Sequence, residues 1–569
     1  MRESGKRVGR LLDEVGAADA RPAQLLCDRH PASAVAFTVV EDDLSGRDIT
    51  YGRLRIRSEQ AAAALASLGV GEGDRVATLM GKGEDLVVTL LGIWRLGAVH
   101  VPLFTAFAPY AIAVRLIPSA TKVVVCDTGQ RPKLDPSEDI PSVPPWRVVI
   151  AGDRSVARPG DALLEALLAA EHPGRPAARR EASDPLVHLF TSGTTGEPKA
   201  VPVPVKALAS FAIYMEYGLD VRDDDVFWNA ADPGWAYGLY YGILGPLFIG
   251  RRNLLVTAGF DVELTWNVLA EYKVTNLAAA PTVYRALRSG EAQAPTRLSL
   301  RACSSAGEPL NPEVVDWAER RLDVPIRDHY GQTELGMTIV NGWHPEVQAP
   351  LKPGSMGRAM PGFTAAILEE GKDVSAPRGV QGRIAIEVPA SPLMWFTGYA
   401  GDPAQTADRF SPDHRWYYTG DLATIDADEF FFFSSRDDDV IIMAGYRVGP
   451  FEVESALLSH PDVVDAAAIG APDELRGEIV EAYVVLREGI PPSPELTAEL
   501  QQHVKTRYAA HAYPRQIHVI DALPKTPSGK IKRFTLRERR RIELHDLTSS
   551  TPRTSPPVAT DVTSAPDGN

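Results

Sequence analysis

Residues 191–199 combine hydroxyl groups, flexible backbone and one ammonium group directly after the apolar run 186–190. The apolar run predicts a buried strand, and the polar stretch predicts the loop in which that strand ends. Glycine lets the main chain approach phosphate oxygens closely, and successive N–H and O–H donors suit a polyanion such as a nucleotide triphosphate. The candidate ligands are Thr191, Ser192, Gly193, Thr194, Thr195, Gly196 and Lys199. The glycine and lysine spacing differs from the Walker pattern, so the loop is a phosphate loop of another lineage or, alternatively, a polar surface turn.

The elements that must position this loop follow from the spacing of apolar residues. We expect helices at 51–69 and 86–96, and strands at 75–80, 99–103, 122–126, 147–150, 226–230, 253–257 and 276–279. Alternating helices and buried strands predict an α/β fold with layered architecture. The chain has 569 residues, more than the roughly 250–300 that one core accommodates, so at least two domains are expected.

A charge run at 436–439 marks a change in organisation. After it, the pattern predicts helices at 452–458 and 494–508 and strands at 463–469, 482–486 and 516–520. These elements form a small α+β unit of their own. The last residues, 548–569, are rich in Ser, Thr and Pro and almost lack large apolar side chains, which predicts disorder.

Composition limits the partners and the compartment. The net charge of -15 and the pI of about 5.4 argue against nucleic acid as the main partner. We expect neither a signal peptide nor a membrane span, because the most hydrophobic stretch, 86–103, is interrupted by Arg95. Cys27, Cys126 and Cys303 lie far apart and lack metal-like spacing, so the reducing cytoplasm is the expected location.

Four further segments follow the loop in a fixed order. They are residues 306–309, 330–334, 418–421 with Arg436 after them, and 524–530. Together with the loop they resemble the motifs of the adenylate-forming superfamily, which comprises acyl-CoA synthetases, adenylation domains and beetle luciferases. Residues 231–235, 307–312 and 445–450 are most similar to the branch of acetyl-CoA and medium-chain acyl-CoA synthetases. The resemblance covers about residues 51–540.

The resemblance implies a large multi-layer N-terminal domain at 1–437, with α/β subdomains, and a small mobile α+β C-terminal domain at 438–546. A hinge would lie at Asp438, and residues 547–569 would form a disordered tail. The implied enzyme is an AMP-forming acid–thiol ligase that uses ATP, Mg²⁺ and coenzyme A.

Activation of a carboxylic acid joins two anions, because a carboxylate oxygen attacks the α-phosphorus of ATP. Charge neutralisation and positioning then carry most of the catalysis, and no general base is required. The resemblance implies that Glu334 holds Mg²⁺ and that Lys530 reaches the α-phosphate and the carboxylate. Thr191 and Lys199 would grip the departing pyrophosphate.

The same resemblance assigns the rest of the nucleotide and CoA sites. Tyr330 would face the adenine, Asp328 would accept from its amino group, and Asp421 suits the ribose diol because a carboxylate accepts two hydroxyl hydrogen bonds. The remaining nucleotide residues would be Gly307, Glu308, Pro309, Gln332, Thr333, Arg436 and Arg447. Gly445 and Lys505 would contact CoA in the second half-reaction, after rotation of the small domain.

The acyl pocket would be lined by Trp235, Ala236, Tyr237, Ala306 and Gly331. Acetate-selective relatives have a tryptophan at the position of Gly331, so the absence of a side chain there predicts space for a longer acyl group. Ala306 and Ala236 would enlarge the pocket further, whereas Tyr237 would restore bulk on one wall. We therefore expect a short- to medium-chain, small branched or aromatic acid, and Gly331→Trp should shift preference toward acetate.

Other readings remain open. The chain could be an acetyl-CoA synthetase, an adenylating enzyme that loads a carrier protein, or a silent nucleotide-binding homologue. A lysine acyltransferase or deacylase acting on Lys530 is a further implied partner, since acylation would remove its charge. Three departures from the family pattern concern turn geometry, namely Ala200, Glu429 and the pair Ser434 and Ser435.

Overall fold

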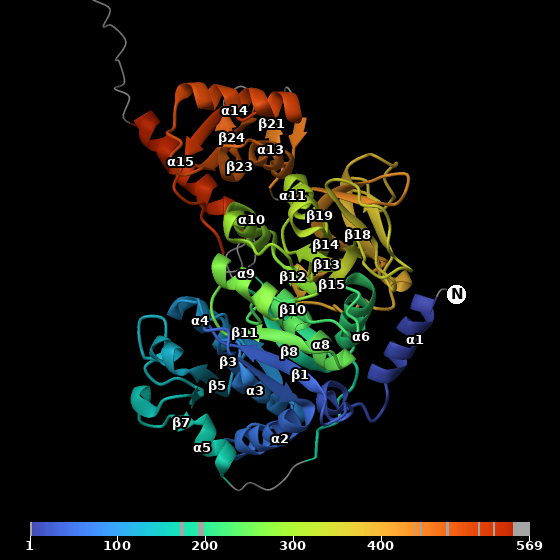
Figure 1. Cartoon of the computed structure of the whole chain (residues 1–569), viewed down its shortest axis with the longest axis vertical. Helices are drawn as coiled ribbons and strands as arrows, with labels where there is room; N and C mark the ends of the chain where they lie inside the picture. Colours follow the sequence, from blue (N-terminus) through green and yellow to red (C-terminus); the bar gives the residue numbers. More distant parts are fainter. Residues whose placement is uncertain are drawn as a thin grey trace, which may run out of the picture. The chain divides into compact units, whose positions relative to one another are not determined.

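The computed structural model describes residues 3–170, 176–191, 198–436, 439–443, 446–473, 477–509, 512–526 and 530–549. It divides into two compact units (Figure 1). The larger comprises Met1–Asp438, Leu458–Val464 and Lys525–Lys530, and the smaller comprises Asp439–Leu457, Asp465–Pro524 and Ile531–Asn569. Each unit is described separately below.

Two sheets dominate the described part of the larger unit. The first has seven strands in the order β7 (Ala162–Leu163), β6 (Arg147–Ala151), β5 (Val123–Asp127), β3 (Arg75–Leu79), β4 (Val99–Pro102), β8 (Pro185–Thr191) and β9 (Lys199–Pro204). Its strands are parallel except β9, which pairs antiparallel with β8. The residues near its centre are aliphatic and fully buried, as expected for a sheet covered on both faces.

The second sheet has thirteen strands among the described residues. A mixed half contains β15 (Gly336–Val340), β14 (Ile326–Gln332), β13 (Ala302–Ala306), β12 (Asn276–Ala279), β10 (Phe227–Asn229), β11 (Asn253–Val256), β1 (Val35–Val40) and β2 (Gly46–Thr50). An antiparallel half continues with β16 (Ser355–Ala359), β20 (Phe431–Arg436), β19 (Trp416–Ile425), β18 (Gly382–Glu387) and β17 (Ala365–Leu368).

Helices cover these sheets. They include α2 (Tyr51–Ser67), α3 (Glu84–Arg95), α4 (Pro109–Leu116), α5 (Leu164–Ala169), α6 (Ala207–Ile213), α7 (Ala236–Leu239), α8 (Gly245–Ile249), α9 (Val262–Glu271), α10 (Pro281–Ser289), α11 (Pro312–Leu322) and α12 (Pro403–Ala407). Helix α2 begins at Thr50, whose hydroxyl accepts from the N–H of Arg53. It packs closely on α3 at Gly92, where a Cβ would lie 2.6 Å from the Cβ of Ala61.

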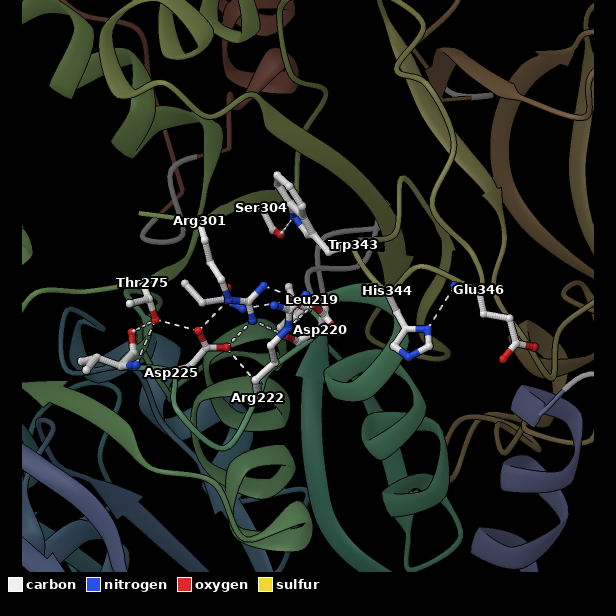
Figure 2. Close-up of polar contacts among 12 residues, drawn as sticks. Leu219, Asp220, Arg222, Asp225, Thr275, Arg301, Ser304, Trp343, His344 and Glu346 are labelled. Carbon is white, nitrogen blue, oxygen red and sulfur yellow. Dashed lines mark hydrogen bonds and ion pairs between the residues drawn. The ribbon is translucent and has the colours of Figure 1, made fainter. Parts of the chain in front are cut away.

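The amino ends of three neighbouring strands carry an ion-pair network (Figure 2). Asp225, Thr275 and Arg301 immediately precede or begin β10, β12 and β13. The Nε of Arg301 and the hydroxyl of Thr275 each donate to Oδ1 of Asp225 at 2.7 Å, and Nη1 of Arg301 lies 3.1 Å from Oδ2 of Asp220. Because parallel strands begin at one edge, this network leaves the carboxyl ends of the same strands for the functional site.

The charged N-terminus forms helix α1 (Glu3–Val15), which the sequence pattern did not lead us to expect. The hydroxyl of Ser4 donates to Oε1 of Glu346 at 2.6 Å, and Nε of Arg7 donates to Oε2 of Glu216 at 2.9 Å. The carboxylate of Glu346 also accepts from the N–H of Ser4, near the positive end of the helix. Contacts distant in sequence therefore anchor this helix.

The smaller unit is a mixed sheet with helices. It contains β21 (Ile441–Met443), β22 (Tyr446–Val448), α13 (Pro450–Leu458), β23 (Val463–Asp473), β24 (Gly477–Leu486), α14 (Pro494–Arg507), β25 (Gln516–Val519) and α15 (Arg533–Ser549). The predicted helices and strands of both units are present, so the α/β class with a small α+β unit is confirmed. Helix α15 extends to Ser549, so the predicted start of the disordered tail at 547 was too early. Residues 550–569 lie outside the described residues.

Within the described ranges, each helix is too short or too polar to cross a bilayer. All three cysteines are buried and unpaired.

Candidate nucleotide-binding site

The predicted phosphate loop leaves the sheet between β8 and β9. Thr191 and Lys199 face each other as the last pair of that antiparallel ladder. Between them, the predicted ligands Ser192, Gly193, Thr194, Thr195 and Gly196 lie outside the described residues. Ala200 continues β9 with ordinary strand geometry, as the replacement of glycine requires.

Lys199 lies beside a buried pair formed by Tyr399 and Glu334. The Nζ of Lys199 is 5.2 Å from the centroid of the Tyr399 ring, and the Tyr399 hydroxyl donates to Oε1 of Glu334 at 2.8 Å. The N–H of Ala400 donates to the carbonyl of Ala200 at 2.9 Å, which fixes Tyr399 alongside β9. Burial, followed by repulsion from Arg409, lowers the pKa of Lys199, while Glu334 acts in the opposite direction. Lys199 and Glu334 thus share one site although different sheets carry them.

Arg409 is a charged residue of this site that the sequence analysis missed. Its Nη1 donates to the carbonyl of Thr419 at 3.1 Å. Burial lowers the pKa of Arg409, but the phenols of Tyr417 and Tyr399 and the carboxylate of Glu334 raise it more, so its pKa is above the ordinary value. No sequence motif marks Arg409, because only the folded chain brings it near Glu334.

Asp421 is the centre of a second polar group. Its Oδ2 accepts from the Tyr330 hydroxyl at 2.6 Å and from Nε2 of Gln332 at 2.7 Å. Its Oδ1 lies 3.7 Å from Nε of Arg436, its partner across β19 and β20. Burial raises the pKa of Asp421, whereas Arg436, the two hydrogen bonds and Lys530 lower it. The structure therefore brings four predicted residues together around one carboxylate.

Lys530 belongs to the larger unit, as do these carboxylates. Burial of its ammonium group and repulsion from Arg436 lower the pKa of Lys530. The carboxylates of Asp421, Glu308 and Glu334 oppose that shift, so the ammonium lies within their electrostatic reach. The residue as a whole still has exposed surface. Among the described residues, the cations around Glu334 and Asp421 thus include Lys199, Arg409, Arg436 and Lys530.

The carboxyl ends of β13 and β14 carry the predicted adenine residues. Gly307 adopts φ 108°, and a Cβ there would lie 3.5 Å from the ring of Trp235. The N–H of Leu310 approaches Oδ2 of Asp328 at 3.4 Å, and burial raises the pKa of Asp328 to about 8. Glu308 is ion-paired with Arg285 at 2.6 Å.

Thr333 and Pro309 lie at the same edge of the sheet. The carbonyl of Thr333 accepts from the Tyr240 hydroxyl at 3.0 Å, which fixes the chain just before Glu334. Pro309 follows Glu308 in the same turn, where the chain leaves β13 for α11.

A hydrogen-bonded aromatic cluster closes one side of the predicted acyl region. Tyr237 and Ala306 are fully buried or nearly so, at 2% and 0% exposed, whereas Trp235 and Ala236 are partly exposed. The Tyr237 and Tyr214 hydroxyls are 3.0 Å apart, and the Tyr214 hydroxyl is 2.8 Å from Nδ1 of His329. The side chain of Tyr237 therefore limits the space for an acyl group on this side.

Backbone fills the direction in which a side chain at Gly331 would point. A Cβ at Gly331 would lie 2.2 Å from the carbonyl oxygen of Gly336 and 2.7 Å from Cα of Met337. The neighbouring backbone of β15 already fills that direction, at an irregularity between Tyr330 and Gly331. Gly331→Trp is therefore not a usable probe of acyl length, because the strand would have to move. The predicted enlargement of the pocket stays a prediction.

The remaining predicted residues belong to the second unit or its border. Asp438 and Gly445 lie outside the described residues, as does the side chain of Arg447. Lys505 stands in the last turn of α14, with its Nζ 4.0 Å from the centroid of the Tyr513 ring. The predicted roles in CoA binding stay predictions.

The residues that depart from the family pattern in the hairpin between β19 and β20 coincide with irregular backbone geometry. Glu429 adopts a left-handed φ of 67°, the conformation that glycine provides without strain. The ladder also shifts register between Leu422 and Ala423, opposite Ser435 and Phe433. Asp421 and Arg436 nevertheless remain paired across these strands.

A cavity of about 640 Å³ lies elsewhere, beside the carboxyl ends of β3 and β5. Its lining includes Arg47, Arg53, Arg57 and Glu84. All three arginines are ion-paired with Glu84. This cavity is distinct from the group of predicted site residues.

Family models place these observations in a known context. The model for AMP-binding enzymes matches residues 25–399, and the model for the AMP-binding enzyme C-terminal domain matches residues 452–530. The acetyl-coenzyme A synthetase of Bacillus subtilis is 36% identical over 518 residues, covering 90% of this chain and 89% of that protein. The human mitochondrial acyl-coenzyme A synthetase ACSM4 is 34% identical over 496 residues, covering 86% of this chain and 84% of that protein.

Solved structures agree. A crystal structure of an acyl-CoA synthetase from Brucella canis has 42% identity and a TM-score of 0.73, covering 95% of this chain and 99% of that chain. A benzoate CoA ligase from Burkholderia xenovorans has 27% identity and a TM-score of 0.80, covering 91% of this chain and 100% of that chain. Fold, ordered motifs and relatives define an AMP-forming acid–CoA ligase. The chain belongs to the AMP-binding enzyme family.

Proposed function

We propose that this enzyme activates a short-chain carboxylic acid as the acyl-adenylate, with release of pyrophosphate, and then transfers the acyl group to free CoA. Adenylation followed by thioester formation is the reaction of the family. The single observation that supports the site assignment is the grouping of Lys199, Glu334, Asp421, Arg436 and Lys530 in one unit.

The first step joins two anions. The carboxylate oxygen attacks the α-phosphorus, and the bond to the pyrophosphate oxygen breaks. Lys530 would neutralise the charge that accumulates between carboxylate and α-phosphate, while Lys199 would hold the departing pyrophosphate. Asp421 would bind the ribose hydroxyls, since Tyr330 and Gln332 both donate to its Oδ2 and Arg436 lies near Oδ1.

The residues present fit a magnesium ion that is shared with the nucleotide. The described residues contain no group of three or more His, Cys, Asp and Glu side chains able to hold a metal ion by themselves. Mg²⁺ is usually bound by one or two carboxylates together with substrate phosphates, and the buried carboxylate of Glu334 meets that need. When bound, the ion would reduce repulsion among the phosphate oxygens.

The length of the substrate acid is proposed from the buried aromatic residues that bound the predicted acyl region. Tyr237 is buried against Tyr214, and the direction of a side chain at Gly331 is filled by backbone, so both features favour the short end of the predicted range. Acetate is the second candidate. Each buried methylene contributes about 0.8 kcal/mol, so a chain that fits is preferred severalfold over one that is a carbon shorter.

A panel of acetate, butyrate, hexanoate and benzoate, scored by kcat/KM for pyrophosphate release, tests the acid. We expect the maximum at butyrate and a steep fall at hexanoate. A maximum at acetate would identify the second candidate, and a maximum at benzoate would show that the aromatic wall moves on binding.

Acid-dependent ATP–pyrophosphate exchange and thioester formation with free CoA test the reaction itself. Lys530→Ala should reduce exchange by roughly 10²–10³-fold, as expected for loss of a charge that stabilises the transition state. Lys532→Ala, an exposed lysine two residues further along, is the matched control. Exchange without thioester formation would favour the carrier-protein alternative, and absence of exchange would favour a silent homologue.

Two further proposals concern the compartment of the enzyme and the modification of Lys530. Three buried, unpaired cysteines support a reducing compartment such as the cytoplasm. Acylation of Lys530 by a lysine acyltransferase would remove the charge that adenylation needs. Peptide mapping of the native protein tests that second proposal.

A further inference from the structure

We propose that Tyr399 and Arg409 form a positioning pair that holds the metal-binding carboxylate of Glu334 and the ribose-binding segment of β19 at Asp421 in fixed relation. This inference rests on the proposed function, because it assigns Glu334 to the magnesium ion and Asp421 to the ribose. It adds two residues that the motifs did not indicate. Both act through other side chains.

Tyr399 meets Glu334 inside the protein. The tyrosine is 5% exposed and Glu334 is 8% exposed, and the hydroxyl donates to Oε1 at 2.8 Å. A phenol has an ordinary pKa of about 10, so near neutral pH the Tyr399 hydroxyl keeps its proton and donates to the carboxylate. A hydrogen bond to an ionised acceptor is short and directional, so it restrains the rotation of the carboxylate.

Arg409 is a cation near the same pair of side chains. The charge of Glu334 and the phenol of Tyr399 raise the pKa of Arg409, so its guanidinium lies within their electrostatic reach. The phenol donates to Glu334. Lys199 approaches the ring face of Tyr399 independently, at 5.2 Å from its centroid. Removing only the hydroxyl would thus leave the contact of Lys199 in place.

Arg409 also holds the part of β19 that leads to Asp421. Its Nη1 donates to the carbonyl of Thr419 at 3.1 Å, and Nε2 of Gln332 donates to the same oxygen at 2.8 Å. Gly420 follows with φ 77°, and a Cβ there would lie 2.7 Å from Nη1 of Arg409. Glycine is needed at this position for the guanidinium to approach, as well as for the backbone conformation.

The geometry explains how the two acids, which come from distant segments of the chain, keep their relative positions. Glu334 follows β14, whereas Asp421 lies within β19. Arg409 donates to the carbonyl two residues before Asp421, and its charge interacts with Tyr399 and Glu334. Loss of Arg409 would free both acids, while loss of the Tyr399 hydroxyl would free only Glu334.

The first experiment compares Tyr399→Phe with Tyr418→Phe. The Tyr418 hydroxyl also donates to a carboxylate, Oδ1 of Asp373 at 2.6 Å, but at the exposed surface, so it is a matched control. Calorimetric titration with ATP should show binding weakened about tenfold in excess Mg²⁺ for Tyr399→Phe, consistent with loss of one charge-assisted hydrogen bond. Binding in excess EDTA should be unchanged, and Tyr418→Phe should match the wild type in both.

The second experiment uses Arg409→Gln and Arg409→Lys, with the exposed Arg415→Gln as control. Arg409→Gln should weaken ATP binding in EDTA as well as in Mg²⁺, because the β19 segment that carries Asp421 is released too. Arg409→Lys should recover part of the binding in Mg²⁺. Gly420→Ala should lose less when Arg409 is already glutamine, since part of its cost is the clash with the guanidinium.

The outcomes separate the two proposals. Absence of acid-dependent exchange in the wild type would refute the proposed function. Normal exchange in the wild type with equal Mg²⁺ dependence in Tyr399→Phe and Tyr418→Phe would refute the positioning role alone. Equal weakening with and without Mg²⁺ in Tyr399→Phe would also refute it, because that pattern indicates general loosening of the fold.

Discussion

At the scale of single residues, burial changes the chemistry that a residue type suggests. Asp328 was predicted as an acceptor for the adenine amino group, and an ionised carboxylate would serve. Burial instead raises its pKa to about 8, and the charge of Glu308 acts in the same direction. Near neutral pH this carboxyl is therefore largely protonated in the absence of nucleotide.

This shift predicts a pH-dependent stability. Below about pH 4 both folded and unfolded states hold the proton; between about 4 and 8 only the folded state does. The unfolded state then binds fewer protons, so the free energy of unfolding falls as pH rises through this window. Asp328→Asn should remove that part of the fall, on the order of 3–4 kcal/mol between pH 5 and 8. Urea titrations of both proteins at several pH values measure it, and parallel curves would contradict the assignment.

At the scale of elements, residues that stabilise the fold and residues of the functional site lie at opposite ends of the same strands. Arg301 pairs with Asp225 and Asp220 at the amino ends of β10, β12 and β13 (Figure 2), opposite the edge that carries Gly307 and Tyr330. Burial by itself would raise the pKa of Asp225. The hydrogen bonds from Arg301 and Thr275 outweigh that effect, so the pKa of Asp225 is below its ordinary value. Asp225 therefore remains charged and depends on its partners.

Arg301→Ala should destabilise the larger unit by about 2 kcal/mol, since it leaves a buried carboxylate without its main partner. Turnover at low temperature should be nearly unchanged. Arg222→Ala is the control, because Arg222 is 52% exposed and pairs with the same Asp220; its cost should stay within about 1 kcal/mol. Thermal unfolding and exchange kinetics on the same preparations decide between a structural and a catalytic role.

The hairpin of β14 and β15 gives the second prediction for an element. Gly331→Ala should cost at least about 2 kcal/mol, because its Cβ would meet the carbonyl of Gly336. Gly259→Ala, where a Cβ meets nothing within 4 Å, should be close to neutral. A stable Gly331→Ala variant with a changed acid profile would contradict the expected clash and would support the predicted role of Gly331 in the acyl pocket.

At the scale of the whole molecule, the chain divides between Asp438 and Asp439. We predict that Asp438 is a hinge whose rotation separates the two half-reactions. Asp438→Pro fixes φ near −65° and should reduce thioester formation by about tenfold or more while leaving ATP–pyrophosphate exchange within about twofold. Asp438→Ala is the control. Equal loss of both half-reactions in Asp438→Pro would contradict the hinge.

The sequence determined the parts of this protein that depend on local pattern. Alternating apolar runs predicted the parallel strands and helices of both units, because burial and periodicity act over short stretches. Ordered motifs likewise indicated Lys199, Glu334, Asp421 and Lys530, since the types of residue needed around a triphosphate are restricted. Helix α1 escaped prediction, because its anchors Glu346 and Glu216 lie more than two hundred residues away.

Only the tertiary structure decided how close the groups come and what fills the space between them. It joined Tyr399 to Glu334 and Arg409 to the carbonyl of Thr419, contacts between residues without a shared motif, and it put the backbone of Gly336 in the direction of a side chain at Gly331. It also set the protonation of Asp328, because the cost of burying a charge depends on the surroundings and not on the residue type. Distances, burial and pKa values arise from packing between distant segments, and local sequence does not encode them.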